Sequence, residues 1–140
     1  MKAEFSQIFT LPTIVDQRGN LTFFENGRDL PIKSIERVYF LHGVPADEER
    51  GGHAHYELEQ MMIAVHGSFR VMLEKNGIKN SVVLSSPDEA LIIQPGTWRV
   101  LDNFSENSVC MVAASMPYSE ADYIRDYDDF VEKTVLGTWV

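Results

Sequence analysis

The chain has little cysteine, few basic residues and no long apolar run. Its only cysteine, Cys110, lies in the apolar run 109–114, so a disulfide within the chain is excluded and a reduced core thiol, typical of the cytoplasm, is expected. Lysine and arginine number 12 against 21 acidic residues, and no basic cluster offers the phosphate contacts that nucleic-acid binding requires. Neither a signal peptide nor an apolar run of about 18 residues is present. We therefore expect a cytoplasmic protein with neither a nucleic-acid partner nor a membrane partner.

The chain does contain a series of short strand-like segments. Over 140 residues, of which 44% are hydrophobic, we expect a single domain spanning residues 1–140. Turn signals separate the apolar segments, and Asn76-Gly77 between two of them is the pattern of a tight hairpin. The predicted strands are 21–25, 35–41, 60–65, 69–74, 78–84, 90–93, 98–102 and 109–114. Strands this closely spaced, without long helices between them, predict an all-β fold closed as a jelly roll or barrel.

The C-terminal part of the chain has a different pattern. Ser119 and the acidic residue three positions later resemble a capping box that opens a helical turn. Residues 127–135 can form one short amphipathic helix, with Phe130 and Val131 facing inward. The expected fold is therefore an all-β barrel with a short C-terminal helix.

Two histidines are the most informative feature of the sequence. His53 and His55 are two positions apart, just before the apolar segment 61–65. Residues two apart on a β-strand point to the same face, so both imidazoles would line the interior of a barrel. Two groups that titrate near neutrality, held side by side in a pocket, suit either metal binding or proton transfer.

The spacing around these histidines resembles the metal motifs of the cupin barrels. The first motif is matched at His53 and His55, but Gln60 stands at the position of its carboxylate ligand. In the second motif, which begins here at Pro95-Gly96, Arg99 takes the place of a histidine. An amide oxygen is a weak ligand for a transition metal, and a guanidinium has no lone pair to give. We therefore expect a cupin-type jelly-roll barrel that holds neither a metal nor another cofactor, with an acid–base site in place of the metal site.

Together these segments resemble the sugar nucleotide 3,4-ketoisomerases, which act on dTDP-4-keto-6-deoxyglucose. The resemblance covers nearly the whole chain and is most specific where the two histidines follow Arg50-Gly51-Gly52. The other matching elements are Asp16-Gln17-Arg18-Gly19-Asn20-Leu21, Arg37-Val38-Tyr39-Phe40, Gln60, Gly67-Ser68, Trp98-Arg99, Tyr118 and Asp122-Tyr123-Ile124-Arg125-Asp126-Tyr127.

This resemblance implies an isomerase that moves the keto group of the sugar from C4 to C3 by histidine-mediated proton transfer through an enediolate. It also implies a homodimer that exchanges N-terminal strands. The pathway implied leads to 3-amino-3,6-dideoxy sugars of bacterial surface glycans, such as lipopolysaccharide, or of secondary metabolites. Two alternatives remain open. One is a cupin that binds a sugar nucleotide as a sensor without catalysis, and the other is a sugar nucleotide 3,5-epimerase, although the chain lacks the extra length usual there.

The residues predicted to form the site fall into two groups. The candidate catalytic residues are His53 as the principal base, His55 as its assistant or relay, and Arg99 and Tyr39 as groups that stabilise negative charge on oxygen. The candidate substrate-binding residues are Arg18, Arg37, Arg50 and Gln60. A diphosphate requires cationic partners, whereas an arginine can also be an ordinary surface charge. In particular, Arg18 could serve only to stabilise its turn, and Tyr39 could simply fill the core.

Other conspicuous residues have simpler interpretations. His42 and His66 lie beside glycines at apparent strand ends and are expected on exposed turns. A group near the C-terminus is expected to stabilise the fold rather than to act in catalysis, namely Asp122, Tyr123, Asp126 and Tyr127. The sequence does not decide the configuration of the product at C4. A bulky cation at Arg18 would restrict the sugar ring and favours galacto over gluco.

Overall fold

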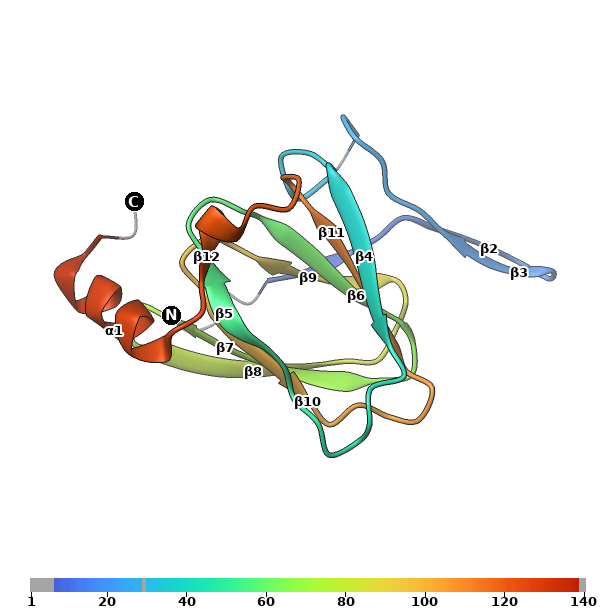
Figure 1. Cartoon of the computed structure of the whole chain (residues 1–140). Helices are drawn as coiled ribbons and strands as arrows, with labels where there is room; N and C mark the ends of the chain where they lie inside the picture. The colour runs from blue at the N-terminus through green and yellow to red at the C-terminus, as the bar shows by residue number, and fades with distance from the viewer. Residues whose placement is uncertain (1–6, 29, 139–140) are drawn as a thin grey trace.

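The computed structural model describes residues 7–28 and 30–138 and shows a β-barrel with one short helix on its outside (Figure 1). Its strands are β1 (Ile8–Thr10), β2 (Thr13–Asp16), β3 (Gly19–Thr22), β4 (Arg37–His42), β5 (Arg50–His55), β6 (Gln60–His66), β7 (Phe69–Lys75), β8 (Ile78–Leu84), β9 (Glu89–Ile93), β10 (Trp98–Asp102), β11 (Val109–Ala114) and β12 (Tyr123–Ile124). A 3-10 turn (Glu120–Asp122) precedes β12, and the helix α1 (Tyr127–Leu136) follows it. Among the described residues, no helix has the length and apolar character needed to cross a membrane.

Two five-stranded sheets form the barrel. One has the strand order β1-β9-β6-β11-β4 and the other has the order β12-β5-β10-β7-β8. Every pairing of these strands is antiparallel. The predicted all-β jelly-roll barrel with a short C-terminal helix is confirmed. Among the described strands, β2 and β3 pair only with each other, and they form an arm that projects from the barrel (Figure 1).

The predicted strands of the barrel itself lie close to the observed ones. The hairpin at Asn76-Gly77 joins β7 to β8, and the positive φ angles of 53° and 77° at these residues are the ones that such a turn needs. The prediction at 21–25 was wrong in position, because the strand covers Gly19–Thr22 and pairs with β2. The predicted strands do not include β1, β2 and β12, which have only two to four residues each and so show little periodicity. They also do not include β5, where only the two histidines indicated a strand.

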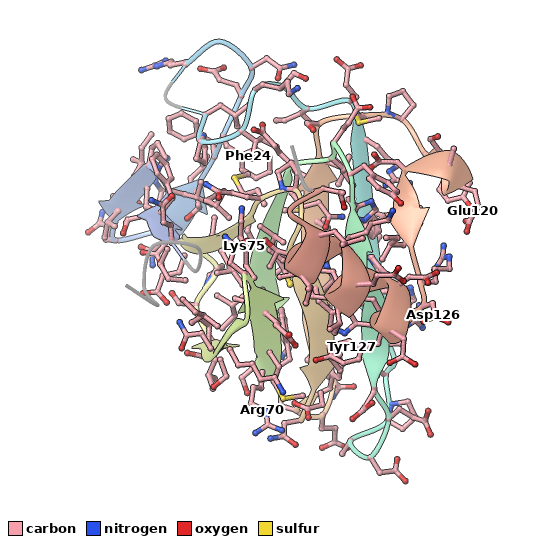
Figure 2. The ribbon with its side chains drawn as sticks, turned by 90° about the vertical axis from the view of Figure 1, so that its left-hand side faces the viewer. Phe24, Arg70, Lys75, Glu120, Asp126 and Tyr127 are labelled. Carbon is pink, nitrogen blue, oxygen red and sulfur yellow. The ribbon has the colours of Figure 1, made fainter. Side chains whose placement is uncertain are left out.

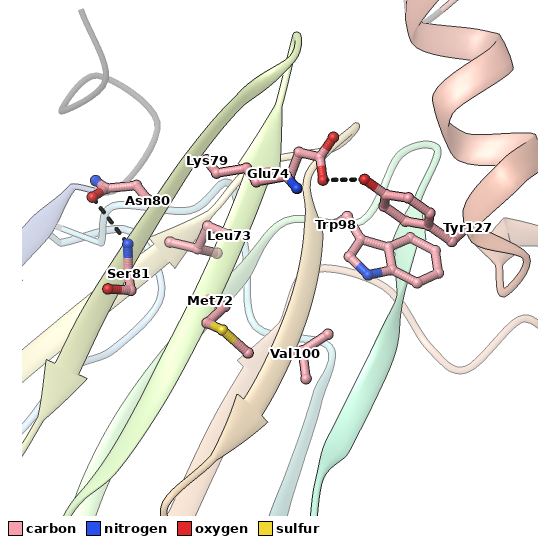
Figure 3. A pocket seen from close by; sticks show the side chains of 9 residues that line it. All are labelled: Met72, Leu73, Glu74, Lys79, Asn80, Ser81, Trp98, Val100 and Tyr127. Atoms are coloured by element: carbon pink, nitrogen blue, oxygen red, sulfur yellow. Dashed lines mark hydrogen bonds between the residues drawn. The ribbon is translucent and has the colours of Figure 1, made fainter.

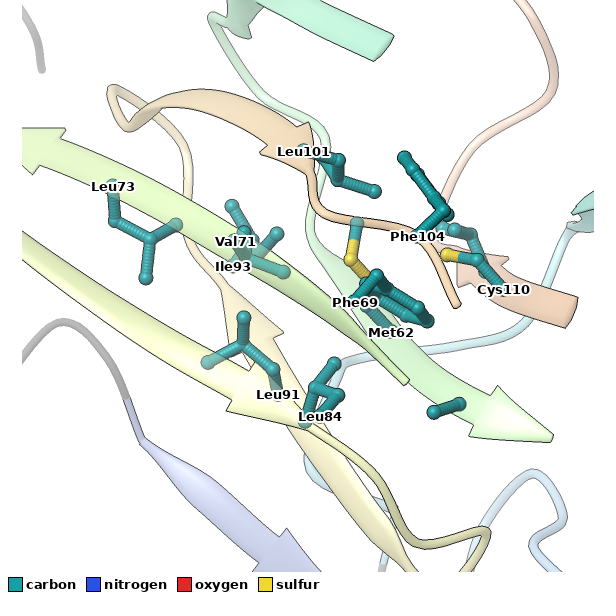
Figure 4. Close-up of a cluster of buried hydrophobic side chains, with 12 residues drawn as sticks. Met62, Phe69, Val71, Leu73, Leu84, Leu91, Ile93, Leu101, Phe104 and Cys110 are labelled. Carbon is teal, nitrogen blue, oxygen red and sulfur yellow. The ribbon is translucent and has the colours of Figure 1, made fainter. Parts of the chain in front are cut away.

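One end of the barrel interior is filled by apolar side chains from both sheets (Figure 4). The buried members are Met62, Ala64, Phe69, Val71, Leu73, Leu84, Leu91, Ile93, Leu101, Phe104, Cys110 and Val112. Cys110 is a free, buried thiol, as predicted, and burial raises its pKa to about 12. Alternate residues of β6 and β10 point into this cluster, so the same alternation places Gln60 and Arg99 inside the barrel beyond it.

Helix α1 covers the outer face of β5 and β12. The Asp126 side chain accepts a hydrogen bond from the Asp129 N–H at 3.1 Å and so caps the helix, which begins at Tyr127 (Figure 2). Phe130 faces the sheet, is fully buried, and packs with Ala54 and Ile124. The predicted helix and its inward-facing Phe130 are confirmed. This packing supports β5 from behind, and β5 is the strand that carries the two histidines.

We predict that Phe130→Ala lowers the free energy of unfolding by about 3 kcal/mol, because it leaves a cavity under α1. Urea denaturation followed by circular dichroism measures this change. Val135→Ala on the same helix is the matched control, since Val135 is 78% exposed and its truncation should cost less than about 0.5 kcal/mol. Equal losses in the two variants would show that α1 does not depend on its buried face.

Candidate active site

Strand β5 brings the two histidines together inside the barrel. The imidazole rings of His53 and His55 lie edge to face, with 4.9 Å between their centroids. His53 stands directly opposite Arg99 of β10. The two strands can approach closely because Gly51 has no side chain: a Cβ there would lie 3.0 Å from the Arg99 carbonyl oxygen, and its φ of +90° disfavours any other residue. The predicted same-face histidine pair is therefore present.

A cavity of about 270 Å³ opens beside these histidines. Its polar lining comes from Tyr39, Arg50, His53, Arg99, Tyr123 and Arg125, and its apolar lining comes from β4, β6, β10 and β11. Three of the predicted catalytic residues thus line one cavity, and His55 lies buried directly beside His53. The cavity combines imidazole, phenol and guanidinium groups within reach of a small polar molecule.

Arg99 is a buried cation whose hydrogen-bond acceptors are neutral among residues 7–28 and 30–138. Its side chain is 1% exposed. It donates hydrogen bonds to Gln60 Oε1 and to the Thr97 carbonyl oxygen, the latter at 3.2 and 3.4 Å. Among the described residues it forms no ion pair. Burial lowers the pKa of Arg99 to about 10, which leaves it protonated at neutral pH. The cavity wall therefore carries a positive charge that an anion can compensate.

The pKa of both histidines is far below its ordinary value. Burial lowers the pKa of His53 to about 3 and that of His55 to about 2, and the nearby positive charge of Arg99 acts in the same direction. Both imidazoles are therefore neutral at pH 7. A neutral imidazole is the form that can accept a proton.

Asp122 fixes the orientation of His55. Its Oδ2 lies 3.1 Å from His55 Nδ1. The same carboxylate accepts hydrogen bonds from the backbone N–H groups of Glu57 and Leu58, at 2.8 and 3.2 Å. A carboxylate held by these donors accepts the Nδ1–H of the imidazole, so the second nitrogen, Nε2, carries the lone pair. That nitrogen is buried and has no hydrogen-bond partner among the described residues.

Tyr123 and Arg125 are cavity residues that the sequence interpretation missed. The Tyr123 ring centroid lies 4.3 Å from that of His55 and 5.0 Å from that of His53. The Arg125 guanidinium lies 4.1 Å from the centroid of the Tyr123 ring and bonds to Glu120. The pairing of β12 with β5 causes this arrangement, since Tyr123 stands opposite His55.

The expected structural role of the C-terminal group is correct for two of its members and incomplete for the other two. Asp126 caps α1, and Tyr127 packs against Trp98 and donates a hydrogen bond to Glu74 at 2.7 Å. Asp122 and Tyr123, in contrast, contact the histidines. Ser119 precedes the 3-10 turn as predicted, but its side chain makes no capping hydrogen bond.

The predicted substrate-binding residues differ in their placement. Arg50 lies on the cavity lining, and the Arg37 guanidinium lies 5.2 Å from the centroid of the Tyr39 ring. Gln60 is fully buried and is not on the cavity lining. The described residues include no group of three His, Cys, Asp or Glu side chains placed to hold a metal ion.

Arg18 is the predicted site residue that lies apart from the others. It occupies the turn between β2 and β3, at the end of the projecting arm, and its side chain is 86% exposed. Its guanidinium pairs with Asp16 at 2.8 Å. Within one chain it therefore stabilises its own turn and does not line the cavity. His42 and His66 are exposed, as predicted.

A second, larger hollow of about 550 Å³ lies on the outer face of the barrel (Figure 3). It is formed by β7, β8 and β10 together with Tyr127 at the beginning of α1. Neither histidine nor arginine lines it, and its apolar surface comes mainly from Met72, Trp98 and Val100. The acid–base groups thus belong to the smaller interior cavity.

The sequence over residues 4–135 matches the family model described as FdtA: WxcM-like, C-terminal. The TDP-4-oxo-6-deoxy-alpha-D-glucose-3,4-oxoisomerase of Aneurinibacillus thermoaerophilus is 39% identical over 125 residues, which cover 89% of either chain.

Solved structures are similar as well. A His-to-Asn mutant of the 3,4-ketoisomerase QdtA from Thermoanaerobacterium thermosaccharolyticum, solved in complex with TDP-4-keto-6-deoxyglucose, is 34% identical, with a TM-score of 0.89 over 94% of either chain. The WlaRB TDP-quinovose 3,4-ketoisomerase of Campylobacter jejuni is 36% identical, with a TM-score of 0.86 over 92% of this chain and 98% of its own. The resemblance read from the sequence is thereby confirmed, and the chain belongs to the FdtA, WxcM-like family of sugar nucleotide 3,4-ketoisomerases.

Proposed function

We propose that the protein is a dTDP-4-keto-6-deoxyglucose 3,4-ketoisomerase, which moves the keto group from C4 to C3. The observation that supports it most strongly is the pair of neutral imidazoles beside a buried guanidinium that has no carboxylate partner in the described part of the chain. The relatives named above, which have this activity by name, support the same assignment.

The reaction is a transfer of hydrogen within the sugar. His53 takes the proton from C3, and the electron pair of that bond moves through the C3–C4 bond to the carbonyl oxygen at C4. The enediolate that results is stabilised by Arg99 and by the hydroxyl of Tyr39. His53 then returns its proton to C4 while the proton of the C3 hydroxyl passes to the oxygen at C4, so that C3 becomes the ketone and C4 carries the hydroxyl. His55, held by Asp122, assists His53 in moving these protons.

The cationic groups at the cavity hold the diphosphate of the substrate. Arg50 and Arg125 line the cavity, and Arg37 lies close to it over Tyr39. Arginine binds phosphate oxygens in pairs of parallel hydrogen bonds, which orients a ligand as well as attracting it. The overall charge of −9 does not prevent this, since local arginines set the field inside the cavity.

The functional unit is a homodimer in which Arg18 serves the cavity of the partner. The arm formed by β2 and β3 exposes Ile14, Val15 and Leu21 by 58%, 70% and 58%, which is unfavourable for a single chain in water. A second copy of the chain would cover these side chains. Exchange of the N-terminal segment between the copies would also bring Arg18, at the end of the arm, to the other barrel.

A sensor without catalytic activity is the alternative from another functional class. Binding alone does not require a pair of neutral imidazoles beside the cavity, which is why we favour the enzyme. A 3,5-epimerase would use similar proton transfers at C3 and C5. Incubation with the substrate in D₂O distinguishes the three possibilities, since the isomerase introduces deuterium at C3 or C4, the epimerase introduces it at C3 and C5, and the sensor introduces none.

We predict that His53→Asn lowers turnover by about 10²–10⁴-fold, because it removes the general base. The measurement is isomerisation of dTDP-4-keto-6-deoxyglucose followed by NMR, together with deuterium incorporation in D₂O. His42→Asn is the matched control, since His42 is exposed at the end of β4 and lies outside the cavity. Wild-type rates in His53→Asn would remove His53 from the mechanism, and tight binding without any exchange in the unsubstituted protein would support the sensor.

The pH dependence of kcat/KM should reflect the lowered pKa of the histidines. A base must be unprotonated to act, and His53 has a pKa of about 3 in the folded protein instead of 6.5. We therefore expect kcat/KM to stay constant as the pH falls from about 8 to about 5, since this parameter reports the groups of the free enzyme. Initial rates across this range test the expectation. A loss of activity centred near pH 6.5 would mean that the active base is an exposed, ordinary histidine.

The exchanged arm predicts complementation between two inactive variants. Arg18→Ala and His53→Asn should each be impaired as homodimers. A mixed dimer contains one complete site, because His53 of one chain meets Arg18 of the other. Co-expression of the two chains should therefore recover about a quarter of the wild-type activity, from random pairing in a twofold dimer.

Size-exclusion chromatography with light scattering verifies that the mixed species is a dimer. No recovery on co-expression, or full activity of Arg18→Ala alone, would contradict the role of the arm.

NMR of the product also gives the configuration at C4, which we expect to be galacto. A pure gluco product would show that Arg18 does not restrict the sugar ring in the way proposed.

A further inference from the structure

We propose that Gln60 is a positioning residue, which holds Arg99 in place and directs the hydroxyl proton of Tyr39 into the cavity. This inference rests on the proposed isomerase function and extends it. Gln60 is fully buried in β6 and does not line the cavity, so it has no surface that a substrate can contact. Its effect on the reaction passes through Arg99 and Tyr39, the two side chains to which it is hydrogen-bonded.

The orientation of the Gln60 amide is determined by Arg99. Arg99 Nη1 donates a hydrogen bond to Gln60 Oε1, and Gln60 Nε2 donates one to the Tyr39 hydroxyl oxygen at 3.1 Å. A guanidinium has five N–H donors and no acceptor, so only the oxygen of the amide can face it. Rotating the amide by 180° would place N–H groups against N–H groups in the buried interior. The NH₂ group must therefore face Tyr39.

The orientation of the amide in turn determines what Tyr39 can do. Because the Tyr39 oxygen accepts the hydrogen bond from Gln60, the single proton of Tyr39 has to point elsewhere. Tyr39 lines the cavity, and burial raises its pKa, so it keeps that proton at neutral pH. The proton is available to a substrate oxygen, where it stabilises the negative charge of the enediolate.

A carboxylate at the same position would have the opposite effect. Glutamate would pair with Arg99 at least as well as glutamine does, but it would accept the hydroxyl proton of Tyr39 instead of donating to the oxygen. Tyr39 would then face the cavity with a lone pair, which repels a developing oxyanion. Gln60 thus sets the direction of a short chain of hydrogen bonds that runs from Arg99 to Tyr39 and on to the substrate.

The test is the substitution Gln60→Glu, alone and combined with Tyr39→Phe. We expect Gln60→Glu to lower kcat by at least about 100-fold, with little change in KM, because it removes one donor to the oxyanion and also pairs with the charge of Arg99. Tyr39→Phe should lower kcat by a similar factor in the wild-type background. In the Gln60→Glu background it should have little further effect, because the donor is already lost there. Gln94→Glu makes the same change in charge outside the cavity, where Gln94 accepts from Lys75 Nζ at 3.1 Å, and should leave kcat unchanged.

Two results would overturn the inference, namely a wild-type kcat in Gln60→Glu or multiplicative losses in the double variant. If Gln60→Glu does not fold, neutron diffraction of the unsubstituted protein in D₂O decides the question. The hydroxyl deuterium of Tyr39 should point into the cavity while an amide deuterium of Gln60 points at the Tyr39 oxygen, and a Tyr39 hydroxyl deuterium directed at Gln60 would refute the proposal. Failure of the proposed function is a separate outcome, since it appears as absent isomerisation by the unsubstituted protein.

Discussion

The site depends on one buried positive charge, that of the Arg99 guanidinium. Transferring a guanidinium from water to a protein interior costs several kcal/mol, and a carboxylate partner usually offsets that cost. Among the residues that the structure describes, Arg99 has only neutral acceptors, the Gln60 amide oxygen and the Thr97 carbonyl, so its charge remains available inside the cavity. The same charge helps to keep His53 and His55 neutral and determines which way the Gln60 amide faces. The base, oxyanion stabiliser and proton donor that we propose therefore depend on one electrostatic arrangement.

The barrel is what makes an unpaired charge tolerable. Apolar side chains fill the other end of the interior, and α1 supports β5 from outside, so the strands that carry the site are held by packing that does not involve it. The register of β10 with β5 places Arg99 opposite His53, and two hydrogen bonds to the Thr97 carbonyl keep the guanidinium from turning toward water. A strand scaffold of this kind positions charged groups more rigidly than a loop does.

The sequence predicted those parts of the site that follow from local rules. Alternation along a strand placed His53 and His55 on one face, and the spacing of two motifs identified Gln60 and Arg99 as replacements for ligands. The contact between His55 and Asp122 could not be predicted in this way, since 67 residues separate them and β12 is only two residues long. Arg18 is a different case, because its proposed place lies on a second copy of the chain, which no feature of one chain's strand pattern specifies.

A base with a pKa of about 3 looks too weak to take a proton from carbon, but that value describes the resting cavity. It is low because burial and the Arg99 charge both disfavour an imidazolium. In the mechanism that we propose, negative charge develops on the sugar within the same cavity when the proton leaves C3, and this charge offsets that of Arg99. The affinity of His53 for its proton therefore rises as the enediolate forms, and it falls again when the proton is delivered to C4. Replacement of a carboxylate ligand by Gln60 and of a histidine ligand by Arg99 thus suits the cavity to a transient anion instead of a metal cation.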